Sequence, residues 1–131
     1  MDKAQAVVAV VENDAAMLKA LGRLLRAAGY RAELYASAEA FIERPPVPQV
    51  GCLVLDIDLG GLSGIELQQR LADAGDAPPI VFVTSQIDTA FQDRAEALGC
   101  LAYLRKPFAS RQLMEALQRA PGLSRLPSVS P

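Results

Sequence analysis

Four short, wholly apolar runs place the strongest constraint on how this chain folds. They are Val7–Val11, Cys52–Leu55, Ile80–Val83 and Cys100–Leu104. Runs of this length are typical of strands that are buried on both faces, as in a parallel sheet. A more polar run, Arg31–Tyr35, predicts a further strand at an edge of the sheet.

The segments between these runs have the capping residues of helices. Asp14 and Ser37 stand at expected N-caps, and Ser63 with Glu66 has the spacing of a capping box. The predicted helices cover residues 15–28, 38–43, 64–74, 88–98 and 110–120. Strands that alternate with helices indicate an α/β fold, a doubly wound parallel sheet with helices on both faces. Right-handed crossovers with one switch point favour the flavodoxin-like strand order 2-1-3-4-5.

Composition and charge are those of an ordinary globular domain. The chain has 131 residues, of which 51% are hydrophobic, and a net charge of -2. We expect one domain over residues 1–120, and a proline- and serine-rich tail or truncated linker over 121–131. Without a basic excess we expect no direct binding of nucleic acid. Because no apolar run approaches the roughly 20 residues that span a bilayer, and no leader precedes the first strand, we expect a cytoplasmic protein without membrane contact.

Cysteine and histidine usage excludes several kinds of site. Cys52 and Cys100 open predicted strands, and we expect both to be small, buried thiols rather than zinc ligands. The chain contains no histidine. It therefore has no imidazole general base, and any phosphohistidine must come from a partner.

Polar side chains follow the predicted strands where each strand ends. They are Glu12, Asn13, Asp56, Asp58, Thr84 and Lys106. The carboxyl ends of parallel strands meet at one edge of the sheet, where ligands bind in such folds. Each residue alone has a simpler explanation, since Thr84 can cap a turn and Lys106 can be a solvated loop lysine. Their equivalent positions in one fold favour a shared site.

The acids in this set predict a cation and a phosphoryl group. Two like charges about 4 Å apart repel by roughly 4 kcal/mol at an effective dielectric of 20. Mg²⁺ offsets such repulsion and prefers oxygen ligands. A carboxylate such as Asp56 can attack phosphorus, while Lys106 and Thr84 neutralise the phosphoryl oxygens. We therefore predict a Mg²⁺-dependent phosphoryl-transfer site.

These residues resemble the receiver domain of two-component response regulators. The resemblance covers about residues 5–120 and is carried by Leu53–Asp56, Ser63–Leu67, Val83–Thr84 and Tyr103–Phe108. The segment Tyr35–Phe41 is similar to the FixJ branch of the family. The resemblance implies a CheY-like fold, and a cis peptide bond before the proline that follows the lysine.

The resemblance also implies a role for each residue of the site. Asp56 would accept the phosphoryl group from a sensor histidine kinase, and Thr84 with Tyr103 would form a switch pair. The metal ligands would be Glu12, Asn13, Asp56 and Asp58. Phosphorylation would then shift the packing of the fourth helix, fifth strand and fifth helix. A homodimer through the fourth helix and fifth strand is a further expectation, and the domain would not be a turnover enzyme, although it would catalyse its own phosphorylation and dephosphorylation.

Two departures from the family pattern have consequences. Asn13 stands where most receivers have a second acid, so we predict weaker binding of Mg²⁺. The carboxylate of Asp58 is a candidate to compensate for this lost charge. Leu59 and Gly60 replace the usual methionine and proline, which should loosen the loop beside the site.

Three other functions compete with this interpretation. A degenerate receiver that only binds proteins is favoured by Asn13. A haloacid-dehalogenase-type phosphatase has an Asp-x-Asp motif like that at Asp56 and Asp58, but after its first strand. A flavin-binding domain of the same topology would need aromatic platforms in its loops. Whether the chain acts alone or is part of a longer DNA-binding regulator stays open.

Overall fold

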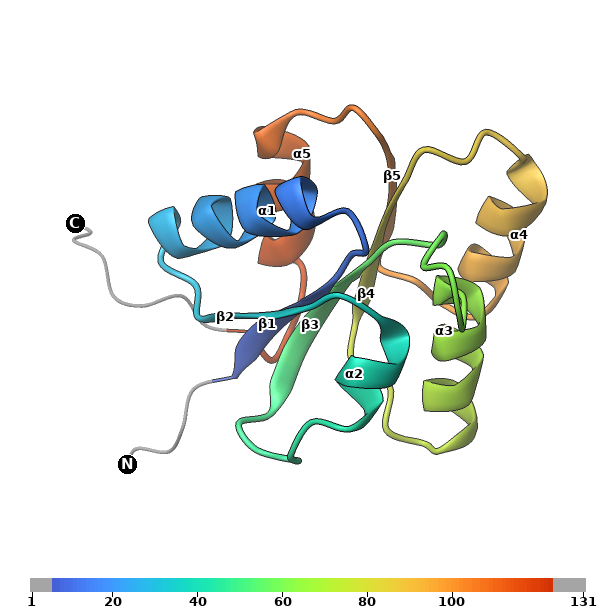
Figure 1. Cartoon of the computed structure of the whole chain (residues 1–131), viewed down its shortest axis with the longest axis horizontal. Helices are drawn as coiled ribbons and strands as arrows, with labels where there is room; N and C mark the ends of the chain where they lie inside the picture. Colours follow the sequence, from blue (N-terminus) through green and yellow to red (C-terminus); the bar gives the residue numbers. More distant parts are fainter. Residues whose placement is uncertain (1–5, 124–131) are drawn as a thin grey trace.

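The computed structural model describes residues 6–123, which form a parallel sheet between two layers of helices (Figure 1). The strands are β1 (Val7–Val11), β2 (Ala32–Tyr35), β3 (Val50–Leu55), β4 (Ile80–Thr84) and β5 (Ala102–Arg105). They pair in parallel in the order β2-β1-β3-β4-β5. The predicted fold class and strand order are confirmed.

The helices divide between the two faces of the sheet. They are α1 (Ala15–Ala27), α2 (Ala38–Ile42), α3 (Gly64–Asp73), α4 (Thr89–Ala97) and α5 (Ser110–Gln118). Helices α1 and α5 cover one face, and α2, α3 and α4 cover the other (Figure 1). Alternate residues of a strand point to opposite faces, so Val8 and Val10 join one core while Ala9 and Val11 join the other. This explains why the central strands are apolar throughout.

The predicted helix caps are confirmed by their hydrogen bonds. The Asp14 carboxylate accepts from the backbone N–H groups of Ala16 and Met17, at 3.0 and 3.2 Å. Ser63 and Glu66 form the expected capping box, because each side chain accepts from the backbone N–H of the other. These local bonds fix where α1 and α3 begin, directly after the loops that follow β1 and β3.

The fifth strand differs from its prediction. It begins at Ala102 rather than Cys100, and its residues are half-buried or exposed. β5 pairs with β4 alone, so it forms an edge of the sheet and one of its sides is open. Cys100 lies in the loop before β5 and is half-buried, whereas Cys52 is buried in β3 as expected.

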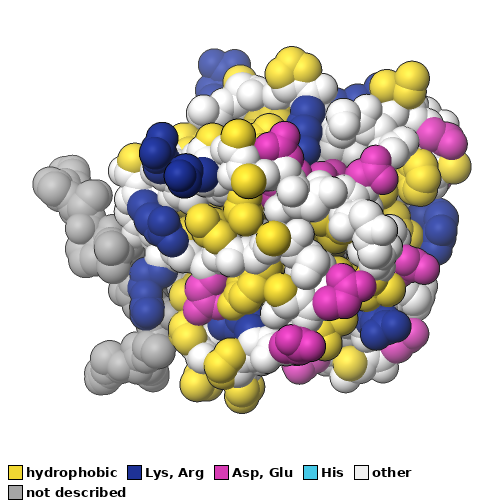
Figure 2. Space-filling model, viewed as in Figure 1, with side chains coloured by type: hydrophobic (Ala, Val, Ile, Leu, Met, Phe, Trp, Pro, Cys, Tyr) yellow, Lys and Arg dark blue, Asp and Glu magenta, His cyan; other side chains and the backbone are white. Residues whose placement is uncertain are grey.

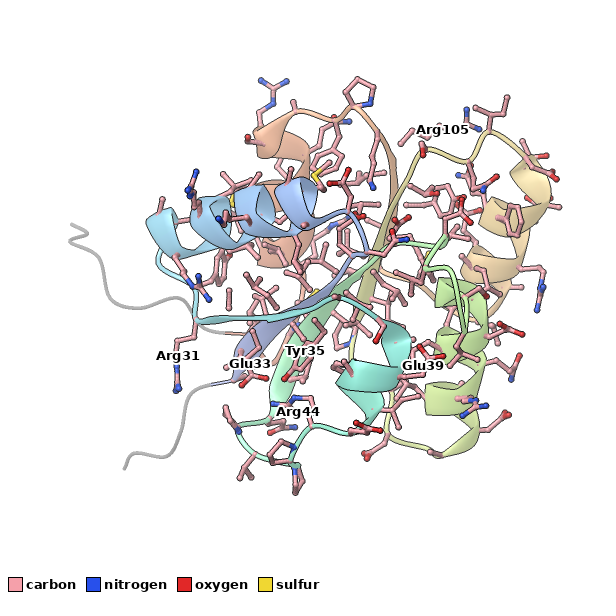
Figure 3. The ribbon with its side chains drawn as sticks, viewed as in Figure 1. Arg31, Glu33, Tyr35, Glu39, Arg44 and Arg105 are labelled. Atoms are coloured by element: carbon pink, nitrogen blue, oxygen red, sulfur yellow. The ribbon has the colours of Figure 1, made fainter. Side chains whose placement is uncertain are left out.

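The opposite edge strand, β2, has a polar network that the sequence did not suggest. Arg44 reaches Glu33 and Tyr35 from the segment after α2 (Figure 3). Its guanidinium lies 2.8 Å from Glu33 and also donates to the carbonyl oxygen of Pro48. The Tyr35 hydroxyl donates to the same Glu33 carboxylate at 2.7 Å. The network thus fastens the α2–β3 loop to the edge of the sheet.

Basic and acidic side chains are unevenly distributed over the surface although the net charge is small. Figure 2 shows basic side chains gathered on the side of α1 and acidic ones over α2 and α3. The exposed residues concerned are Lys19, Arg23, Arg26 and Arg31 on the first side, and Glu39, Glu43, Glu66 and Asp73 on the second. No helix among residues 6–123 is long and apolar enough to cross a membrane. Most of the expected tail, residues 124–131, lies outside the described residues.

Candidate functional site

The strand-end residues meet in one hollow at the carboxyl edge of the sheet. The hollow has a volume of about 390 Å³ and is lined mainly by polar side chains. Its lining residues are Glu12, Asn13, Asp14, Asp56, Asp58, Gly60, Ser85 and Lys106. Five of the six polar residues expected at the site therefore line this hollow, and Thr84 lies buried at the end of β4 beside it.

Lys106 is directed into this hollow rather than into solvent. Its Nζ lies 2.7 Å from Glu12 Oε1 and 3.5 Å from Asp56 Oδ2. Both carboxylates are nearly inaccessible, with Glu12 1% and Asp56 4% exposed. The peptide bond between Lys106 and Pro107 is cis, as the resemblance implies. The ammonium thus contacts both acids, and its shorter contact is with Glu12.

The contacting charges of the site are two carboxylates and one ammonium, and this imbalance affects their pKa values. Burial, followed by the neighbouring charge of Glu12, raises the pKa of Asp56 to about 6, although Lys106 acts in the opposite direction. Burial lowers the pKa of Lys106, but its hydrogen bond with Glu12 and the charge of Asp56 outweigh this, so the pKa is raised overall. Two buried carboxylates share one ammonium, and the site has an excess of negative charge.

This donor set is suited to a hard cation. Asp56, Asn13 and Asp58 offer oxygen atoms around the same hollow, and a divalent cation would relieve the charge that raises the pKa of Asp56. Within residues 6–123, no three acidic or cysteine side chains gather closely enough to form a metal cage by themselves. Mg²⁺ usually keeps several waters and takes one or two protein carboxylates, so these residues fit such an ion.

Two turns at the rim of the site have the same hydrogen-bond pattern. The Asp58 N–H donates to Asp56 Oδ1 at 3.3 Å, and the Gln86 N–H donates to Thr84 Oγ1 at 3.0 Å. The Gln86 side chain then donates to Asp58 Oδ2 at 2.8 Å, which joins the two turns. Sequence reasoning missed Gln86, because a single glutamine in a loop has no periodicity or motif to identify it.

Gly64 is a second residue that sequence reasoning missed. A Cβ atom at this position would collide with the backbone carbonyl of Asp56 and with Ile57. The Gly64 N–H also donates to the Ile57 carbonyl at 2.9 Å. The first turn of α3 therefore packs directly on the backbone that carries Asp56. The Ser63-Gly64 sequence was the available signal, but it was used only as a helix start and as part of the family resemblance, with no packing role assigned to Gly64.

Tyr103 lies on β5, next to the strand that ends in Thr84. The register pairs Tyr103 with Phe82 and Arg105 with Thr84. The ring centroids of Tyr103 and Phe82 are 6.0 Å apart. The Tyr103 hydroxyl is buried and has no hydrogen-bond partner among the described residues, and burial raises its pKa. An unpaired buried hydroxyl is costly, so a packing in which it gains a partner would be favoured.

Comparisons with known proteins agree with this geometry. The family model for response regulator receiver domains matches residues 8–118. Response regulator protein TmoT of Ectopseudomonas mendocina is 32% identical over 120 residues, which cover 92% of this chain and 54% of TmoT. Transcriptional regulatory protein FixJ of Bradyrhizobium diazoefficiens is 35% identical over 85% of this chain and 54% of its own length.

The solved structure of FixJ-N is 29% identical to this chain and superposes on it with a TM-score of 0.83. The superposition covers 95% of this chain and 100% of the FixJ-N chain. The similarity to FixJ in both comparisons supports the predicted branch of the family. The chain spans about half the length of the two curated relatives.

Proposed function

Since this chain belongs to the family of response regulator receiver domains, we propose that Asp56 is its phosphoacceptor and a sensor histidine kinase its phosphodonor. One observation carries the proposal. A buried carboxylate at the carboxyl edge of the sheet lies 3.5 Å from an ammonium, in a hollow rich in oxygen donors. Such an arrangement suits a nucleophile that must accept a highly charged group.

The proposed transfer exchanges one bond to phosphorus for another. The ionised Asp56 carboxylate attacks the phosphorus of a phosphohistidine on the kinase. An oxygen–phosphorus bond forms, the nitrogen–phosphorus bond breaks, and the electron pair leaves with the imidazole. The Lys106 ammonium and the Thr84 hydroxyl neutralise charge on the phosphoryl oxygens. Bound Mg²⁺ would neutralise further charge, held by Asp56, Asn13 and Asp58 with Glu12 beside them.

Signal output is proposed to depend on Thr84 and Tyr103. The Thr84 hydroxyl now accepts from Gln86, and the Tyr103 hydroxyl lacks a partner among the described residues. If Thr84 turns toward a phosphoryl group, the space beside β5 changes and Tyr103 can repack. Helix α4 has only Ala95 buried, so this helix is weakly held and suited to move.

A homodimer is proposed to use the surface of α4 and β5. Helix α4 provides Ala90, Phe91 and Ala97, and the β5 side provides Leu101 and Tyr103. Exposed or half-buried side chains of α4, such as Phe91, are available for a partner. On this proposal the domain acts on itself and is not a turnover enzyme.

The test is phosphorylation by a small-molecule phosphodonor with Mg²⁺, measured by intact-protein mass. We expect the wild type to gain one phosphoryl group and Asp56→Asn to gain none. Asp76→Asn is the matched control, because Asp76 is an exposed acid just before β4, at the end of the sheet away from the site. No gain by the wild type, under conditions that label another receiver, would favour the degenerate receiver that only binds proteins.

A further inference from the structure

The hydrogen bond between Asp58 and Gln86 spans the mouth of the site. Asp58 follows β3 and Gln86 follows β4, and their side chains meet at 2.8 Å. Gln86 is anchored at its own backbone, whose N–H donates to the buried Thr84 hydroxyl. The backbone that carries the Gln86 side chain is therefore held in place from the β4 side. The Gln86 amide thus reaches the carboxylate of Asp58, an exposed residue, from an anchored backbone.

Apart from Asp58, the site offers few charged groups that are free to bind a cation. Both oxygens of Glu12 are engaged, one by Lys106 at 2.7 Å and the other by the Asp14 N–H at 3.1 Å. Asn13 lines the hollow with a neutral amide. Asp58 lines the hollow as well, yet it forms no cluster of three acids with Glu12 and Asp56 in the described structure. The Asp56 carboxylate accepts only longer hydrogen bonds, at 3.3 Å from the Asp58 N–H and at 3.5 Å from Lys106, so it stays available to a cation.

We propose that Gln86 is a positioning residue that holds the Asp58 carboxylate away from the cation, and that Asp58 supplies the charge missing at Asn13 when this bond opens. The proposal rests on the proposed Mg²⁺-dependent function. An exposed amide–carboxylate hydrogen bond is weak, so a divalent cation can displace it. A further carboxylate close to the ion then strengthens binding by direct attraction. Gln86 thereby sets how tightly the unphosphorylated domain binds Mg²⁺.

The experiment is a Mg²⁺ titration of the unphosphorylated protein by isothermal calorimetry. It compares the wild type with Gln86→Ala, Asp58→Asn and the double variant. We expect Gln86→Ala to lower the Kd about three- to tenfold. In the Asp58→Asn background, the same substitution should change the Kd by less than about twofold. Gln92→Ala is the matched control, because Gln92 donates to Glu96 at 3.0 Å on the exposed face of α4.

Three results would overturn this role of Gln86. They are an unchanged Kd in Gln86→Ala, weaker binding in that variant, or tighter binding that persists without the Asp58 carboxylate. Phosphorylation of Asp56 at saturating Mg²⁺ is measured separately. If the wild type is phosphorylated but Gln86→Ala leaves the Kd for Mg²⁺ unchanged, the role of Gln86 is refuted and the proposed function is retained.

Discussion

Replacing Asp56 with asparagine should stabilise the folded domain at neutral pH. The variant removes the negative charge that burial and Glu12 disfavour. Asparagine keeps an oxygen that can accept from the Asp58 N–H, a bond of 3.3 Å in the wild type. Lys106 keeps its shorter contact with Glu12. The site therefore loses an unfavourable charge and retains most of its hydrogen bonds.

The magnitude follows from the pKa of Asp56, which is raised from 3.8 to about 6. A raised pKa means that the folded state binds the proton more tightly than the unfolded state does. Ionisation therefore destabilises the fold as pH rises from about 4 to about 6, and the full penalty is present above this range. About two units correspond to an upper limit of about 3 kcal/mol. The site is open to solvent through its hollow, so screening reduces the expected gain to about 1–2 kcal/mol.

Urea denaturation without divalent cations measures this effect. At pH 7.5 we expect Asp56→Asn to raise the free energy of unfolding by about 1–2 kcal/mol, and the difference to shrink as pH falls through 6 toward 4. Asp93→Asn, an exposed acid on α4, should change it by less than about 0.5 kcal/mol. A destabilised Asp56→Asn, or a gain independent of pH, would refute the electrostatic account of the site.

Three further substitutions test other parts of the structure. Asn13→Asp should tighten Mg²⁺ binding severalfold in a calorimetric titration, because it restores a charge at the hollow. Gly64→Ala should lower the free energy of unfolding by about 1–3 kcal/mol and slow phosphorylation, because its Cβ would displace the Asp56 backbone. Arg44→Met should cost about 1–3 kcal/mol in urea denaturation, because it leaves Glu33 and Tyr35 without their shared partner.

Each of these substitutions has a contrary outcome, and the last two have matched controls. An unchanged Mg²⁺ affinity in Asn13→Asp would show that this position does not contribute to the ion's site. Gly122→Ala controls for Gly64→Ala, because an added Cβ there meets no atom within 4 Å. Arg94→Met controls for Arg44→Met, since Arg94 is exposed on α4. If a variant and its control change the free energy of unfolding equally, the contact proposed for that variant does not account for the change.

Much of the fold was predictable because its signals are local. The apolar run Val7–Val11 became β1 with the predicted bounds, and the Ser63–Glu66 capping box marked the start of α3. The prediction of a buried strand from Cys100 was wrong, because composition does not reveal that β5 has a neighbouring strand on one side only. Burial of an apolar strand depends on what covers it, and this is settled by the assembled sheet.

The candidate site was likewise predictable in part from the sequence. Residues at strand ends were identifiable because the carboxyl ends of parallel strands must meet. Which atoms touch was not identifiable, since Lys106 and Glu12 are 94 residues apart and their contact depends on side-chain reach across two loops. Gln86 and Arg44 escaped notice because their partners lie in other segments of the chain.

The sequence alone determined the order of strands and helices and the edge at which polar residues gather. Those properties follow from residue patterns within short segments and from the geometry of a parallel sheet. Only the tertiary structure decided that Lys106 lies closer to Glu12 than to Asp56, and that Gln86 holds Asp58. Such choices depend on differences of about one ångström between side chains that only folding brings together.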